Sequence, residues 1–271
     1  MRLTLRSRIW RARWPIYCEV AFVALLDLVY EVMRALVAPD IQGVNASLVH
    51  AHDIARLESA LGANVETSVQ RITDAIAGGR CATTWYDTLA YTTLFVGFLI
   101  SVWVWRRQNC AFVRNSFVMS QAVALVVVWR YPSAPPRLAA SGLIDTTRHA
   151  LTLGGALGWF QQLRNQYAAM PSLHIGLSFL YALALVWLFC ASWGRWRQVW
   201  WVPPLWMAWV TMATANHYLL DGIAGVLTVL VAQAITHKLT ARDVPRPWQR
   251  CAPGMPAGPH DGTRANPGEG G

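Results

Sequence analysis

The sequence is short of charge. Asp, Glu, Lys and Arg make up 14% of its 271 residues, and a single lysine accompanies 22 arginines. A soluble domain carries about 25% charged residues, so this deficit excludes an ordinary soluble domain. The chain is instead 55% hydrophobic, with a mean hydropathy of +0.30. It contains apolar runs of roughly 18 residues or more, the length that crosses a hydrocarbon core.

The sequence also lacks the motifs of several other protein classes. Its five cysteines stand singly, without a CxxC pair or metal-ligand spacing, which argues against a disulfide framework or a zinc site. It has no Gly-rich nucleotide loop and no internal repeat. A net charge of +9 suggests nucleic-acid binding in a soluble protein, but here the arginines lie between apolar runs, where they indicate membrane topology. We therefore expect no nucleic-acid partner.

Six apolar segments are long enough for transmembrane helices, and they predict an all-α, polytopic bundle of six spans. They are residues 16–37, 84–105, 112–129, 172–191, 198–215 and 218–236. Arginine-rich segments precede the first span and follow the second, fourth and sixth, so all of them fall on one side of the membrane. That side is predicted to be cytoplasmic, and both termini with it.

This topology predicts three parts and two long outer segments. A basic cytoplasmic N-terminus (1–15) precedes the membrane catalytic domain (16–243), and a Pro- and Gly-rich cytoplasmic tail (244–271) follows it. The composition of the tail predicts disorder. Residues 130–171 form the second outer segment, which we predict to be an active-site loop.

The first outer segment, residues 39–83, carries a stripe of apolar residues at intervals of three or four. The stripe consists of Ile54, Leu57, Leu61, Val65, Val69, Ile72 and Ile76. The opposite positions carry polar residues, among them Glu58, Glu66 and Gln70. This pattern predicts one amphipathic helix lying along the bilayer surface, with a coiled-coil partner helix as the alternative.

Three short polar segments lie at the outer ends of predicted spans. The first runs from Arg130 to Arg137 and contains three prolines. Guanidinium groups bind phosphate oxygens through paired hydrogen bonds, and the prolines lower the entropy lost in holding them. Taken alone, these arginines also fit side chains that snorkel to the interface.

The second segment opens the fourth predicted span with Pro171, Ser172 and His174. A helix start presents backbone N–H groups to anions, so a phosphate is expected near Ser172, with His174 beside it. A helix cap with an interfacial histidine is the alternative.

The third segment places His217 four residues before Asp221, on one face of the sixth predicted span. A carboxylate inside an apolar run costs at least ~2.5 kcal/mol unless it is paired. Pairing with the imidazole fixes its tautomer and leaves the other ring nitrogen free to attack. A purely structural histidine–aspartate bond is the alternative.

Together the three segments have the groups needed for in-line displacement at phosphorus. His217 is the predicted nucleophile, Asp221 orients it, and His174 protonates the leaving oxygen. Arg130, Arg137 and the backbone near Ser172 are predicted to bind the phosphate oxygens.

These motifs resemble those of the type 2 phosphatidic acid phosphatase superfamily. Its pattern is a basic residue, six others and an arginine, then Pro-Ser-x-His, then His-x-x-x-Asp, and the chain matches it at Arg130 to Arg137, Pro171 to His174 and His217 to Asp221. The variants Ala-Met-Pro-Ser-Leu-His and Asn-His-Tyr-x-x-Asp are most similar to the branch of fungal inositol phosphorylceramide synthase and its bacterial relatives.

The resemblance implies a six-span bundle, a phosphohistidine intermediate, and neither metal nor cofactor. The chain departs from the pattern in places. It has Arg130 where lysine is usual, and Val210 and Thr211 stand where the phosphatases have a Ser-Arg pair. Arg164 is a candidate replacement for that arginine, with an ordinary loop arginine as the alternative.

The sequence therefore predicts an enzyme of the plasma membrane that acts at the extracytoplasmic face on a lipid phosphate or phospholipid. The residues leave the acceptor open between water and a polyol hydroxyl such as that of inositol. The group transferred can be phosphate itself, or inositol phosphate or a similar head group. The rival hypothesis is a non-catalytic transporter or scaffold that uses the intramembrane His217–Asp221 pair.

Overall fold

The structure is a computed structural model that describes residues 15–87, 91–139, 142–146, 165–188 and 194–240. Within these ranges every regular element is a helix. The predicted termini (1–14 and 241–271) and most of the predicted active-site loop lie outside the described residues, Arg164 among them.

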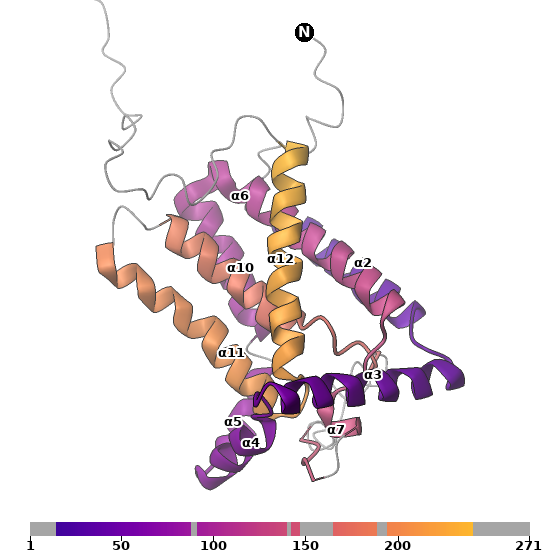
Figure 1. Cartoon of the computed structure of the whole chain (residues 1–271). Helices are drawn as coiled ribbons and strands as arrows, with labels where there is room; N and C mark the ends of the chain where they lie inside the picture. The colour runs from indigo at the N-terminus through magenta and orange to yellow at the C-terminus, as the bar shows by residue number, and fades with distance from the viewer. Residues whose placement is uncertain (1–14, 88–90, 140–141, 147–164, 189–193, 241–271) are drawn as a thin grey trace, which may run out of the picture.

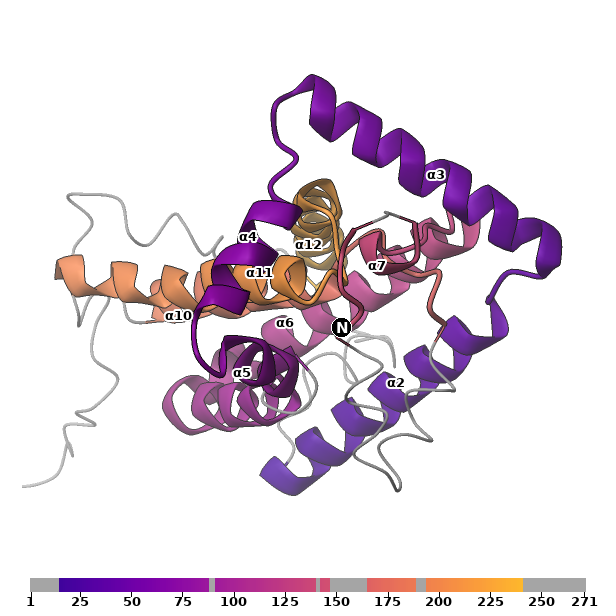
Figure 2. The same ribbon diagram turned by 90° about the horizontal axis from the view of Figure 1, so that it is seen from below.

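Five helices form a bundle, and four shorter or transverse ones lie at one end of it (Figure 1). The bundle consists of α2 (Ile16–Leu36), α6 (Tyr91–Arg130), α10 (Leu173–Leu188), α11 (Val202–Ala213) and α12 (Leu219–Thr240), with the 3-10 helix η2 (Gly194–Trp201) leading into α11. The end is covered by α3 (Ile41–Ala60), α4 (Glu66–Ala75), α5 (Gly79–Trp85) and α7 (Pro136–Ala139). Figure 2 views the molecule from this end and shows α3 extending beyond the bundle.

The helix α6 differs from the sequence-based expectation. Two spans separated by an arginine loop were predicted over residues 84–129, but the backbone is helical without a break from Tyr91 to Arg130. In Figure 1 this helix has two limbs, which meet at the end of the molecule away from α3 and α7. Helical hydrogen bonding therefore continues through the polar residues that were expected to form the loop.

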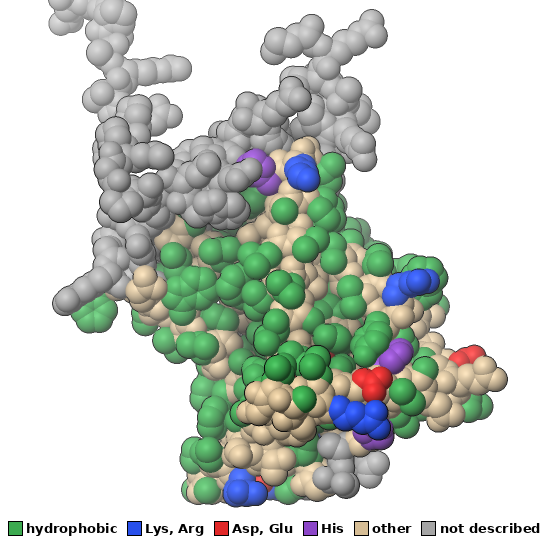
Figure 3. Space-filling view, viewed as in Figure 1, with side chains coloured by type: hydrophobic (Ala, Val, Ile, Leu, Met, Phe, Trp, Pro, Cys, Tyr) green, Lys and Arg blue, Asp and Glu red, His purple; other side chains and the backbone are tan. Residues whose placement is uncertain are grey.

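Two helices of the described residues are long and apolar enough to cross a membrane, Cys110–Arg130 and Leu219–Leu239. Leu173–Trp187 is a shorter apolar helix. In Figure 3 hydrophobic side chains cover the bundle helices, while the charged and histidine side chains in view gather toward the two ends. The exposed side chains of α11 and α12 include Leu205, Leu227 and Val231. Such surfaces suit a membrane protein, and the number of spans stays a prediction.

The outer segment is not the single amphipathic helix that the apolar stripe predicted. Turns at Gly62 (φ +65°) and Gly78 (φ +75°) follow α3 and precede α5, so the chain forms three helices. Most of the stripe is exposed, including Leu57, Leu61 and Ile72. The face of α3 that packs inward instead carries Ser47, Ala51, Ile54 and Glu58. The prediction of one continuous helix was wrong because the chain turns at these two glycines, and Glu58 was wrongly assigned to the polar outer face.

The helices α10 and α12 cross in direct backbone contact. A Cβ atom on Gly225 would lie 2.1 Å from the carbonyl oxygen of Ser172, and one on Gly176 would lie 2.6 Å from that of Gly225. At the same crossing the Ser172 N–H donates to the Asp221 carbonyl oxygen at 2.9 Å. Small residues permit this approach of two helices. It brings the beginnings of the two motif-bearing helices together.

Candidate active site

His217 lies two residues before α12 and Asp221 lies in its first turn. Both are buried, with 7% and 0% of their surfaces exposed. Their closest atoms, His217 Nδ1 and Asp221 Oδ2, are 3.7 Å apart. This distance fits an ion pair and exceeds a hydrogen bond. Asp221 Oδ2 accepts instead from the N–H of Tyr218, at 2.9 Å. The carboxylate therefore binds the turn that carries the histidine and lies beside its Nδ1 atom.

The second histidine faces the first. The ring centroids of His174 and His217 are 5.7 Å apart, with 53° between the ring planes. His174 lies in the first turn of α10, directly after Ser172 and Leu173. The backbone contact between α10 and α12 holds the two imidazoles near each other.

Ser172 takes part in the helix crossing. It is fully buried, and its Oγ atom accepts from the N–H of Ile175 at 3.5 Å. Its own N–H is bonded to Asp221, so in this structure that N–H joins the two helices. The predicted role of Ser172 in phosphate binding stays a prediction.

Arg137 lies next to the third motif. Its backbone N–H donates to the Ala215 carbonyl oxygen at 3.1 Å, and its Nη1 atom donates to Asn216 Oδ1. Its Nε atom is 3.7 Å from Asp145, and Asn216 in turn donates to Asp87 at 2.6 Å. The Asp145 carboxylate and the Asn216 amide thus hold the guanidinium, and Asp87 in turn holds Asn216, the residue that precedes His217.

The backbone of Ala215 has an unusual conformation that supports this contact. Its φ angle is +54°, in the left-handed region that non-glycine residues rarely adopt. The residue is fully buried, and its carbonyl oxygen receives the Arg137 N–H. Such a conformation costs about 1 kcal/mol or more. The surrounding packing stabilises it, and the turn directs His217 toward His174.

Arg130 is not joined to these residues. It ends α6 with an exposed side chain, and its guanidinium lies 5.8 Å from the ring of its neighbour Trp129. Among the described residues no hydrogen bond or ion pair connects it to His174, His217 or Arg137. Its predicted phosphate-binding role stays a prediction, as does that of Arg164.

The segment between α6 and α7 is held in place by backbone bonds to distant parts of the chain. Ser133 forms an isolated parallel bridge with Ala168, just before the second motif, and the N–H of Ala134 donates to Ser47 of α3. His50 of α3 stacks on Tyr131 at 3.9 Å and bonds the Pro132 carbonyl oxygen at 2.8 Å. The first motif is thereby aligned beside the second.

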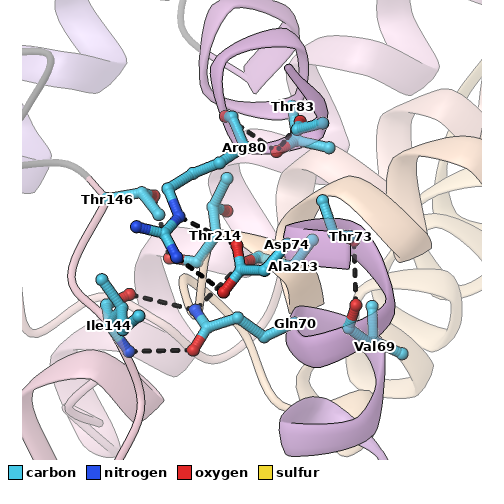
Figure 4. A network of polar contacts seen from close by, with 11 residues as sticks. Val69, Gln70, Thr73, Asp74, Arg80, Thr83, Ile144, Thr146, Ala213 and Thr214 are labelled. Carbon is cyan, nitrogen blue, oxygen red and sulfur yellow. Dashed lines mark hydrogen bonds and ion pairs between the residues drawn. The ribbon is translucent and has the colours of Figure 1, made fainter. Parts of the chain in front are cut away.

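Gln70 of α4 performs a similar role for the third motif (Figure 4). Its amide exchanges two hydrogen bonds with the backbone of Ile144, at 3.0 and 2.9 Å, and donates to the Ala213 carbonyl oxygen at 3.1 Å. The side chain therefore links the loop that carries Asp145 to the end of α11. Sequence reasoning missed it because the residue had been assigned to a polar outer face.

Two more residues near the site were missed in the same way. Glu66 Oε1 accepts from the N–H of Leu219 at 3.1 Å, and Glu58 Oε1 accepts from the N–H of Leu220 at 2.7 Å. Both side chains are buried, with 2% and 0% of their surfaces exposed. Burial, together with the nearby negative charge of Glu66, raises the pKa of the Glu58 carboxyl to about 8. The sequence carried one signal for the burial of Glu58: Ser47, Ala51, Ile54 and Glu58 are spaced by four, three and four residues, so they share one face of a helix.

The site contains two imidazoles, carboxylates and a guanidinium. Within the described ranges no group of three or more His, Cys, Asp or Glu side chains has an arrangement suited to a metal ion. The chemistry that these groups support is nucleophilic attack by a buried imidazole, proton transfer by a second one, and binding of an anion by Arg137.

Comparison with known proteins gives one result. The sequence profile of the PAP2 superfamily matches residues 52–235, which include all three motifs and the helices α4 to α11. The chain has no significant match among curated proteins or among solved structures.

Proposed function

Since the chain belongs to the PAP2 superfamily, whose members are in general phosphatases and phosphotransferases, we propose that it transfers the phosphoryl group of a lipid phosphate through a phosphohistidine on His217. The observation that carries the proposal is the placement of His217 between Asp221 and the ring of His174. Arg137 is hydrogen-bonded to Asn216, the residue before His217.

In the first step, one imidazole nitrogen of His217 attacks phosphorus. Asp221 lies beside Nδ1, so Nε2 is the attacking atom. The N–P bond forms as the bond from phosphorus to the lipid oxygen breaks, and His174 gives that oxygen its proton. Arg137 stabilises the charge on the remaining phosphate oxygens.

In the second step, His174 accepts the proton of an incoming hydroxyl whose oxygen attacks phosphorus, and the N–P bond breaks. Water gives inorganic phosphate, and a polyol gives a new phosphoester. We propose transfer to a polyol such as inositol, in line with the branch that the motif variants resemble. Asn216, one of those variant residues, binds the side chain of Arg137, so this variant position lies beside the proposed phosphate-binding arginine.

The proposed location is the plasma membrane, with the site at the extracytoplasmic end. The spans are α2, the two limbs of α6, α10, α11 and α12. Supporting this orientation, the site lies at the α3–α5 end of the bundle, whereas Lys238 lies in the last turn of α12, at the opposite end. The excess of basic residues is expected on the cytoplasmic side.

The test is release of phosphate from a panel of lipid phosphates in detergent, with EDTA present throughout and with or without inositol. Wild type should release phosphate, or form a new phosphoester when inositol is present. His217→Ala should abolish both products, and Arg137→Ala should lower both. His237→Ala, a histidine at the other end of α12, is the matched control and should behave as wild type. Unchanged turnover in His217→Ala would overturn the proposal.

A further inference from the structure

Three consecutive backbone N–H groups at the start of α12 are each bound by a different carboxyl group. Asp221 accepts from Tyr218, Glu66 from Leu219 and Glu58 from Leu220, at 2.9, 3.1 and 2.7 Å. The first N–H groups of a helix have no partner within the helix, and negative charge there is stabilising. The turn that follows His217 is therefore bound from its own helix and from the outer helices α3 and α4.

The two glutamates form a buried pair of carboxyl groups, and the charge of this pair depends on its protonation. Both carboxyl groups are buried and bind neighbouring N–H groups of one turn, so they lie close together, and a proton on one of them avoids two buried like charges. Glu58 Oε2 is buried and has no hydrogen-bond donor among the described residues, in keeping with a proton at this position. The other charged group acting on Glu58 is Asp221. A fully ionised pair would place three negative charges around one helical turn.

We propose that Glu58 and Glu66 are positioning residues for the nucleophile His217, and that they act as a carboxyl pair sharing one proton. The inference rests on the proposed function. The pair binds the two residues that follow Tyr218, and Tyr218 is itself bound to Asp221, so displacing the pair moves the turn against which His217 is oriented. The helices α3 and α4 thereby belong to the catalytic unit.

This role has a kinetic signature. Neither glutamate has a described contact with Arg137 or His174, so loss of the pair should lower kcat and leave KM nearly unchanged. For Glu58→Ala we expect a loss in kcat of about 10- to 100-fold, the effect usual for groups that orient a functional side chain. Glutamine accepts and donates as a protonated carboxyl does, so Glu58→Gln should retain most of the activity.

The experiment measures kcat and KM for Glu58→Ala, Glu58→Gln and Glu66→Ala. Asp53→Ala, an exposed carboxyl on the same helix, is the matched control and should match wild type. Wild-type kcat in Glu58→Ala overturns the inference. Equal loss in Glu58→Gln and Glu58→Ala also overturns it, because then the hydrogen bonds of the pair are not what matters.

A second readout needs no activity. His217 is buried, so diethyl pyrocarbonate should modify it slowly in wild type, as measured by mass spectrometry of its peptide. Glu58→Ala should speed this modification several-fold, while Glu58→Gln and Asp53→Ala leave it unchanged. An unchanged rate in Glu58→Ala contradicts the inference even if wild type proves inactive. Inactive wild type with faster modification in Glu58→Ala instead contradicts the proposed function and supports the positioning role.

Discussion

At the scale of single residues, the proposed reaction depends on which nitrogen of His217 is available. Asp221 lies beside Nδ1 and binds the N–H of Tyr218 with the same oxygen. The carboxylate thus has two roles, one in the local fold and one in the state of the imidazole. A substitution that keeps the hydrogen bond to Tyr218 and removes the charge beside the imidazole separates these two roles.

Asp221→Asn is that substitution, because an asparagine oxygen still accepts from Tyr218 but carries no charge to stabilise the imidazolium or select its tautomer. We expect kcat to fall roughly a hundred- to ten-thousand-fold, with the thermal unfolding midpoint nearly unchanged. Turnover and unfolding are measured on the same preparation. A loss of activity matched by a loss of folded protein would assign Asp221 to structure alone.

Asn216 is the second residue with a separable role, since it joins Arg137 to Asp87. Asn216→Ala should free the guanidinium from this clamp and lower kcat/KM by about tenfold, mainly through a higher KM, because phosphate binding loses a preordered cation. Steady-state kinetics checks this. Asn64→Ala, an exposed asparagine whose amide bonds Ser59, is the control, and an equal effect there would refute the assignment.

At the scale of elements, the crossing of α10 and α12 fixes the separation of the two histidines. A methyl group on Gly225 would lie 2.1 Å from the Ser172 carbonyl oxygen, which is backbone and cannot turn aside. Gly225→Ala should therefore push the helices apart, lower stability by about 1–3 kcal/mol and reduce turnover. In contrast, Gly97→Ala in α6 has open space around its Cβ. It should leave both quantities unchanged or raise stability slightly. Denaturation in detergent and turnover provide the measurements.

The contact of α3 with α12 should make stability depend on pH. The pKa of Glu58 is raised from an ordinary 4.5 to about 8, so between these values the folded chain holds a proton that the unfolded chain releases. The stabilising effect of this proton is complete below pH 4.5 and is lost as pH rises toward 8. The unfolding midpoint of wild type should fall across this interval, and that of Glu58→Gln should fall less. Parallel curves would show that another group is responsible.

Comparison of these elements with the sequence shows what can be predicted and why. The superfamily and the all-helical architecture were predictable, because they depend on local apolar runs and on motifs read within a few residues. The burial of Glu58 was not, because its partner Leu220 lies 162 residues further along the chain. An acidic residue on an amphipathic helix is assigned to solvent unless that distant N–H is known. The unbroken course of α6 was hidden for a related reason, since arginines between apolar runs are typical of loops.

At the scale of the whole molecule, the proposed orientation in the membrane predicts which cysteine is reachable from outside. Cys81 on α5 is a free, exposed cysteine at the site end of the bundle. A variant that retains Cys81 as its single cysteine should react with a membrane-impermeant maleimide added to intact cells. A variant that retains Cys251 alone, in the predicted cytoplasmic tail, should react after permeabilisation. The reverse pattern would place the site on the cytoplasmic side.

The glycine contact between α10 and α12 also limits how the protein can vary. Because the helices that carry the two histidines are joined by a backbone hydrogen bond and by glycines that admit no side chain, the spacing of the histidines depends on the backbone rather than on the size of neighbouring side chains. The separation of the two histidine rings is therefore constant. Adaptation to a different head group or acceptor has to come from the parts that surround the histidines, such as the loop of Asp145 and the helices α3 and α4.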